Sequence, residues 1–235
     1  MSKRGLFVAG AGTEIGKTYV TAALTRRLRS EGRAVLALKP VASGVPPLGD
    51  PAFAGSDTAI LLAALGLPTT PATVAACTPW RFAAALGPDL AAAREGRGLD
   101  PQAVIDWCRR RIGEAPEDAA VLVEGVGGLM SPLSADATGL DWLVALGLPA
   151  LLVSGSYLGA ISHALTAAEV LAGRGVRLGA VVVSESLEAP VAPETVAEAL
   201  ARRIAAPAIV LRRGAPCPDT LLDALAPLLG LHTRL

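Results

Sequence analysis

The sequence predicts an α/β fold, in which helices cover both faces of a doubly wound, mostly parallel sheet. The first observation is that six short runs of aliphatic residues recur along the chain, each apolar on both faces. Such runs are typical of strands that are covered on both sides. The second is that helix-like stretches separate several of these runs, and strands that alternate with helices favour parallel pairing.

The predicted elements follow one another in a regular order. Strands are expected at residues 6–9, 34–38, 119–123, 150–153, 178–183 and 208–211, and helices at 17–30, 159–174 and 193–203. Residues 44–56 are interpreted as a loop, and residues 66–100 as a long irregular or helical insertion. Neither segment resembles an interdomain linker and no repeat is found, so residues 1–235 are expected to form a single domain.

The composition excludes several classes of function. The chain has 21 basic and 21 acidic residues, without the basic surplus expected of a nucleic-acid-binding protein. No apolar run approaches the roughly 18 residues of a membrane span, and the apolar patch near the N-terminus is too short for a signal peptide. Because Cys77, Cys108 and Cys217 lie far apart, without metal-ligand spacing, a cytoplasmic location is expected. No nucleic acid and no membrane are expected as partners.

Glycine-rich and polar segments follow the predicted strands. They read GAGTEIGKT, KPVASG, EGVGG, SGSYLG and SES after the first to the fifth strand. Ligands of such sheets bind at the carboxyl ends of the strands. The sequence therefore predicts a binding site at this edge of the sheet.

The first segment has the features of a phosphate-binding P-loop. Gly10, Gly12 and Gly16 allow backbone N–H groups to turn toward phosphate oxygens, and the following helix directs its positive end at them. Lys17 can reach the terminal phosphates and the Thr18 hydroxyl can ligate Mg²⁺. A strict P-loop has its leading glycine five positions before Gly16, where this chain has alanine, so the Walker A loop is a variant one. The alternative is an ordinary strand-to-helix turn.

The variant spacing resembles that of dethiobiotin synthetases, whose loop usually reads GTDTEVGKT. KPVASG matches the second motif of that family residue for residue. SDTAILL, VLVEGVGGLMSPLS and LGAISHALTAAEVL resemble three further segments, so that the resemblance covers about the first 185 residues. It implies an ATP- and Mg²⁺-dependent ligase of biotin biosynthesis, which closes a ring on 7,8-diaminononanoate and CO2 through a carbamate and a carbamic-phosphoric anhydride.

The resemblance also implies roles for single residues. Lys17 and Lys39 would stabilise negative charge during the reaction, and hydroxyls of Thr13 and Ser43 would orient the carbamate. The metal would be held by Thr18, Asp57 and Glu124. The nucleotide would contact Gly12, Thr13, Glu14, Ile15, Gly16, Lys17, Thr18, Glu124, Gly127 and Ser184.

Each of these residues also has a simpler interpretation. Lys39 could extend to solvent or pair with an acid. Asp57 follows Ser56 at a predicted helix start, as an ordinary first-turn acid does, and Glu124 could cap a helix.

The substrate tail carries a carboxylate, which in this family is bound by backbone N–H groups from the other subunit of a homodimer. The matching positions here are Leu158, Gly159, Ala160 and Ser162, at a predicted helix start. His163 is interpreted as a structural residue rather than a general base.

Three positions depart from the family pattern. Ser162 replaces an asparagine, Gly87-Pro88-Asp89 replaces Ser-Pro-His, and Ser184 replaces the asparagine that reads the adenine base. A serine cannot present the paired donor and acceptor of an amide, so a relaxed nucleotide preference is expected.

The main alternative is a P-loop ATPase switch of the partitioning class. Those switches carry an early lysine at the position of Gly12, and its absence here favours an enzyme. A cobyrinate-type amidotransferase shares this ATP-binding half but needs a further glutaminase domain.

Overall fold

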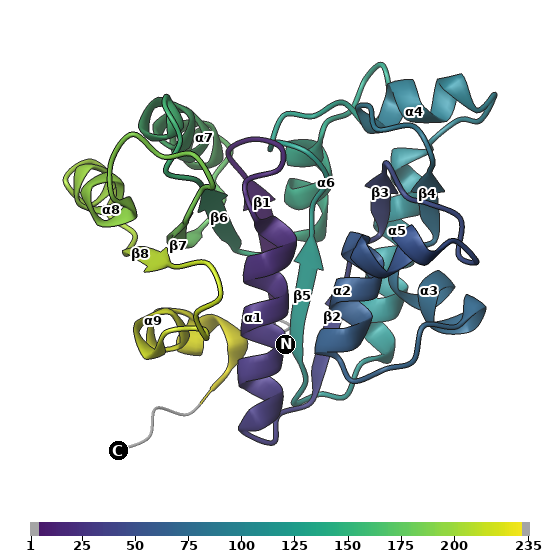
Figure 1. Ribbon diagram of the computed structural model, residues 1–235, viewed down its shortest axis with the longest axis horizontal. Helices are drawn as coiled ribbons and strands as arrows, with labels where there is room; N and C mark the ends of the chain where they lie inside the picture. Colours follow the sequence, from purple (N-terminus) through teal and green to yellow (C-terminus); the bar gives the residue numbers. More distant parts are fainter. Residues whose placement is uncertain (1–4, 232–235) are drawn as a thin grey trace.

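The computed structural model describes residues 5–231, and its centre is a six-stranded sheet in which every pairing is parallel. The strand order is β2-β5-β1-β6-β7-β8 (Figure 1). The strands are β1 (Gly5–Gly10), β2 (Val35–Leu38), β5 (Ala120–Glu124), β6 (Ala150–Ser154), β7 (Leu178–Ser184) and β8 (Ala208–Leu211). All six predicted strands are therefore confirmed, and the chain reverses its direction of winding beside β1, where ligands bind in such sheets.

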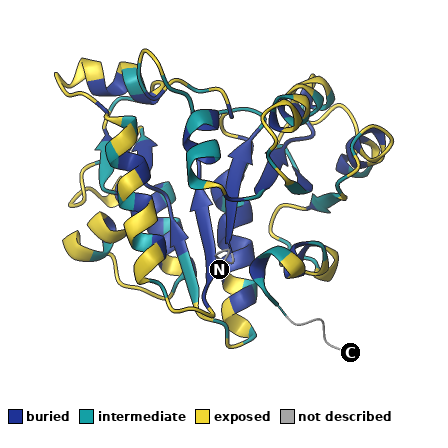
Figure 2. Ribbon diagram, turned by 180° about the vertical axis from the view of Figure 1, so that it is seen from behind, coloured by how far each residue is buried: buried dark blue, intermediate teal, exposed yellow. Residues whose placement is uncertain are grey.

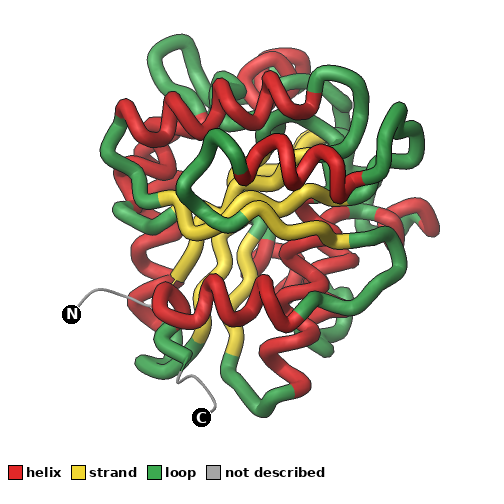
Figure 3. Tube along the Cα trace, turned by 90° about the vertical axis from the view of Figure 1, so that its left-hand side faces the viewer, coloured by secondary structure: helices red, strands yellow, loops and turns green. Residues whose placement is uncertain are grey.

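Helices cover both faces of this sheet, because successive strand side chains point to opposite sides. On one side Leu6 and Val8 pack against α1 (Lys17–Ser30) and α9 (Asp219–Leu229). On the other side Phe7 and Ala9 share a core with α5 (Pro101–Glu114), α6 (Gly139–Leu146), α7 (Ala160–Gly173) and α8 (Pro193–Ala201). Figure 2 shows the buried strands between helices whose outer faces are exposed, and Figure 3 shows the same layers from the side.

A second, two-stranded parallel sheet lies beyond β2, and the sequence did not predict it. It pairs β3 (Val41–Ser43) with β4 (Trp80–Phe82), and around it lie η1 (Pro51–Gly55), α2 (Asp57–Ala64), α3 (Pro71–Cys77) and α4 (Pro88–Arg94). The insertion at 66–100, expected to be irregular or helical, is a mixture of both: α3, β4 and α4 are short and are joined by irregular segments. The loop at 44–56 contains a short 3₁₀ helix, which is held by the burial of Phe53. Strands of three residues are too short to show a periodicity in the sequence.

Of the helices within residues 5–231, none has the length and the apolar character that crossing a membrane requires.

Candidate functional site

The phosphate loop connects β1 to α1 at the carboxyl edge of the sheet. Its backbone is left-handed at Glu14 (φ 57°) and at Gly16 (φ 91°). Gly16 also lies directly against Ser184 at the end of β7, and a Cβ at this position would collide with the serine hydroxyl. A glycine is therefore required at position 16 both by conformation and by space.

Lys17 extends from the start of α1 back over this loop. Its side chain is buried, and Nζ donates a hydrogen bond to the carbonyl of Gly12 at 3.2 Å. Burial, and after it the nearby positive charge of Lys39, lower the pKa of Lys17 to about 8, although Glu124 and Asp57 act in the opposite direction. The two ammonium groups thus lie close enough to influence each other, although they come from separate crossovers.

Lys39 lies at the centre of a buried cluster of charges. Its Nζ donates to Glu124 Oε1 at 2.6 Å and to the Gly125 carbonyl at 3.1 Å, and it forms an ion pair with Asp57 Oδ2 at 3.1 Å. Burial opposes the charge of Lys39, but Glu124 and Asp57 together raise its pKa above the ordinary value. Of the two interpretations of this lysine, pairing with acids is the one that the structure bears out.

Thr18 and two carboxylates form a set of hard oxygen donors. The Thr18 hydroxyl donates to Glu124 Oε1 at 2.6 Å. Burial opposes ionisation of Asp57, but the positive charge of Lys39 holds the pKa of this carboxyl below its usual value. Three side chains that are far apart in the sequence therefore meet where the phosphates of a P-loop ligand would lie.

One oxygen of this set has no hydrogen-bond partner. Glu124 is completely buried, and among the residues described its Oε2 accepts no hydrogen bond. An unpartnered carboxylate oxygen in the protein interior is costly unless a ligand or ion satisfies it. Within the described residues no group of three or more His, Cys, Asp or Glu side chains could enclose a metal. The donors instead suit Mg²⁺, which is commonly held by one or two carboxylates together with phosphates and waters.

A cleft of about 610 Å³ opens above this cluster. It brings together most of the residues predicted for the site, and its lining includes Thr13, Glu14, Ile15, Gly16, Lys17, Thr18, Lys39, Ser43, Asp57 and Gly127. Val45, Ala85 and Leu86 also line it, and no local pattern in the sequence indicated them. Gly87, which the sequence marked only as a departure from the family pattern, lines it too. They come from the chain around the β3–β4 sheet, which explains why this unpredicted sheet matters for the site.

Other predicted residues lie next to the cleft rather than in its lining. Gly12 belongs to the phosphate loop, Glu124 ends the neighbouring strand β5, and Ser184 is buried behind Gly16. Residues 158–162 form the turn and first residues of α7, where Leu158 is 86% exposed. In this turn Tyr157 Oη lies 2.8 Å from Nδ1 of His163.

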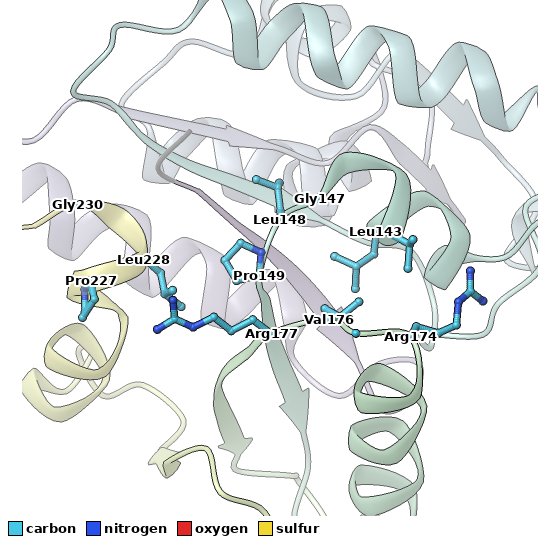
Figure 4. Close-up of a pocket in the computed structure, with 12 residues that line it drawn as sticks. Leu143, Gly147, Leu148, Pro149, Arg174, Val176, Arg177, Pro227, Leu228 and Gly230 are labelled. Atoms are coloured by element: carbon cyan, nitrogen blue, oxygen red, sulfur yellow. The ribbon is translucent and has the colours of Figure 1, made fainter. Parts of the chain in front are cut away.

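A second hollow, of about 540 Å³, lies at the opposite, amino end of the sheet (Figure 4). Pro149 and Arg177, which directly precede β6 and β7, line it together with Leu143, Val176 and Leu228. Of the residues described around it, none carries a carboxylate or a hydroxyl. The chemistry of the molecule is therefore concentrated in the cleft at the carboxyl edge.

Comparisons with known proteins give one consistent result. A family model described as an AAA domain matches residues 4–211. A protein of Methylobacterium nodulans named ATP-dependent dethiobiotin synthetase BioD is 66% identical over 220 residues, which cover 94% of this chain and 98% of that protein. A protein of the same name from Caulobacter sp. strain K31 is 47% identical, with coverage of 94% and 96%.

Similar solved structures support the fold class. They include the MinC:MinD cell division complex of Aquifex aeolicus, at a TM-score of 0.57 and 14% identity, covering 100% of this chain and 98% of that one. Chloroplast FtsY of Physcomitrella patens has a TM-score of 0.54 at 19% identity, with coverage of 96% and 66%. At these identities the likeness concerns the P-loop NTPase fold alone.

Proposed function

The chain belongs to the ATP-dependent dethiobiotin synthetase family of C–N bond-forming ligases, and we propose that it converts 7,8-diaminononanoate and CO2 into dethiobiotin. One substrate amine adds to CO2 and loses a proton, which gives a carbamate. The γ-phosphoryl group of ATP passes to a carbamate oxygen, and ADP leaves. The second amine attacks the carbonyl carbon of this mixed anhydride, and the ureido ring closes as phosphate departs.

The observation that carries the proposal is the convergence of Lys17 and Lys39 on one cleft. Lys17 lies over the phosphate loop and Lys39 lies beside it, and both are buried. Fixed positive groups in a site shielded from water stabilise the charge that develops on a transferring phosphoryl group. We assign Lys17 to the phosphates and Lys39 to the oxygens shared by carbamate and phosphate.

We propose that Thr18, Asp57 and Glu124 would hold Mg²⁺, which would neutralise part of the charge of the phosphates. The unpartnered Oε2 of Glu124 supports this assignment. Thr13 and Ser43 line the same cleft, and their hydroxyls would orient the carbamate for in-line transfer.

A homodimer would complete the site. We propose that residues Leu158, Gly159, Ala160 and Ser162 of one subunit bind the tail carboxylate of the substrate held by the other. Exposed apolar side chains on the loops that follow β5, β6 and β7 support such a contact: Met130, Leu158 and Leu187 are 53%, 86% and 83% exposed. The action of the enzyme on a small soluble metabolite and its three free, buried cysteines fit a cytoplasmic location.

The proposal is tested by incubating the purified protein with diaminononanoate, bicarbonate and Mg-ATP and measuring dethiobiotin by mass spectrometry. Reactions without ATP, or with Glu124→Gln, are the controls and should give no product. A protein that hydrolyses ATP but never forms dethiobiotin, and that dimerises only with nucleotide, would instead be a switch.

A further inference from the structure

Tyr157 lies where three parts of the carboxyl edge meet. Its ring folds over Gly155, where an added Cβ would collide with ring carbons, and its hydroxyl lies 2.8 Å from Nδ1 of His163 on α7. On its other side the hydroxyl approaches the phosphate loop, since a Cβ added at Gly12 would lie 3.4 Å from Oη. One hydroxyl therefore stands between the phosphate loop and the first turn of α7.

The segment that carries Tyr157 is held from both sides. Ser156 and Ser186 exchange two hydrogen bonds of 3.0 Å, each from a backbone N–H to the other hydroxyl. The N–H of Ala160 donates to the carbonyl of Tyr157 at 3.1 Å, which closes the turn. A shift of Tyr157 would thus move the whole turn at residues 157–160 rather than one side chain alone.

The phosphate loop and the tyrosine hydroxyl are neighbours with room for a methyl group between them, since a Cβ added at Gly12 would meet Oη at an ordinary van der Waals distance of 3.4 Å. The carbonyl of Gly12 accepts the hydrogen bond from Lys17, and Ile15 of the same loop belongs to the apolar cluster against which the tyrosine packs. A movement of Gly12 toward α7 when phosphates bind would therefore bring the loop against Tyr157, and packed interfaces answer such a movement by shifting between discrete arrangements.

We infer that Tyr157 is a positioning residue that couples the phosphate loop to the turn at residues 158–160, with His163 fixing the direction of its hydroxyl. The inference rests on the proposed function, in which this turn binds the carboxylate of the substrate tail. Nucleotide binding would raise the affinity for the tail, and by thermodynamic reciprocity the substrate would raise the affinity for nucleotide equally. Since the turn is proposed to serve the partner subunit, this coupling would link the two active sites of the dimer.

The test measures binding of diaminononanoate and of a Mg-bound, non-hydrolysable ATP analogue, each alone and in the presence of the other, by calorimetry. In the wild-type protein we expect each ligand to raise the affinity of the protein for the other ligand. The factor should lie in the range of about 5 to 150 that is typical of allosteric coupling. Tyr157→Phe keeps the ring and removes the hydroxyl, and should reduce this factor to below about threefold while the separate affinities change by less than about twofold.

The chain offers a matched control, because it has only two tyrosines. The hydroxyl of Tyr19 donates to the carbonyls of Arg212 and Ala215 and not to α7, although Tyr19 also lines the cleft. Tyr19→Phe can therefore change the affinity for nucleotide itself but should retain the coupling factor. His163→Ala should lose the coupling between the two ligands, as Tyr157→Phe does. His163→Asn keeps a polar atom near the position of Nδ1 and should retain most of this coupling.

The outcomes separate the inference from the proposed function. If the wild-type protein forms dethiobiotin and binds both ligands without coupling, or if Tyr157→Phe keeps full coupling, the inference is wrong and the proposed function stands. If the protein neither binds diaminononanoate nor forms product, both are wrong. A spectroscopic readout is independent of affinity: the chain has two histidines, and the ring signals of the one lost in His163→Asn should shift when the ATP analogue binds.

Discussion

Nζ of Lys39 lies 2.6 Å from Oε1 of Glu124, although the two residues are 85 positions apart in the chain. Both side chains are buried, so this is an ion pair shielded from water. Thr18 donates to the same carboxylate oxygen. The lysine that we propose for the substrate and the carboxylate that we propose for a metal are therefore held in one hydrogen-bonded cluster. The first two predictions follow from this arrangement.

Replacing Lys39 by alanine should abolish turnover while nucleotide binding persists. Lys17 and the phosphate loop, which would hold the nucleotide, are unchanged, whereas a fixed positive group at the transition state is lost. We expect kcat to fall by about 10²–10³-fold, as for the removal of other preorganised charge-stabilising groups. Arg177→Ala, at the opposite end of the sheet, is the control, and a normal rate of ring closure in the Lys39→Ala variant would show that the role assigned to Lys39 is wrong.

Removing only one member of the buried pair should destabilise the fold. Lys39→Met leaves the completely buried Glu124 without its ammonium partner, and we expect a loss of about 3 kcal/mol in the free energy of unfolding. The double variant Lys39→Met/Glu124→Gln removes both charges and should regain most of this loss. Urea unfolding of the wild type, of the single variants Lys39→Met and Glu124→Gln, and of the double variant measures the effect as a double-mutant cycle. Strict additivity of the two single changes would contradict it.

Lys17 should make stability depend on pH in alkaline solution. Its pKa is about 8 in the folded protein and 10.5 in the unfolded chain, so between these values the unfolded state binds more protons. Stability therefore rises with pH in this window, since the penalty for burying the ammonium is fully present below pH 8 and disappears toward pH 10.5.

The Lys17→Met variant removes this penalty and should be more stable than the wild type at pH 7, by up to about 3 kcal/mol. The difference should shrink steadily in unfolding experiments at pH 8, 9 and 10. If the difference in stability stays constant over this range, the pKa of Lys17 is not lowered in the folded protein.

Nucleotide selectivity should be weak. Ser184, at the position where the family has an asparagine, is nearly buried behind Gly16 and has no amide to present to a base. Loss of one such hydrogen-bonding pattern is worth about 1 kcal/mol, so kcat/KM for ATP, CTP and GTP should agree within about tenfold. Strict discrimination in favour of adenine would indicate that another segment reads the base. The loop at residues 211–216, which is hydrogen-bonded to Tyr19 of α1, would then be the first segment in which to make substitutions.

Much of the fold was predictable because it is encoded locally. The six strands of the main sheet are continuous apolar runs, and α1 begins directly after the glycines of the phosphate loop. The β3–β4 sheet was not predictable, since each strand has three residues and its partner lies about 40 positions away. The contribution of residues 85–87 to the cleft was missed for the same reason.

What the sequence determined by itself is the order of apolar strands, the composition of the segment after each strand, and hence the edge of the sheet at which chemistry occurs. Only the tertiary structure decided which residues at that edge come together: Lys39 with Glu124, Gly16 with Ser184, and Tyr157 with His163, close to the phosphate loop. The physical reason is that periodicity and backbone preference act over a few neighbouring residues. Contacts between strand ends depend instead on the order in which strands pair, and in a parallel sheet that order is set by the packing of the whole core.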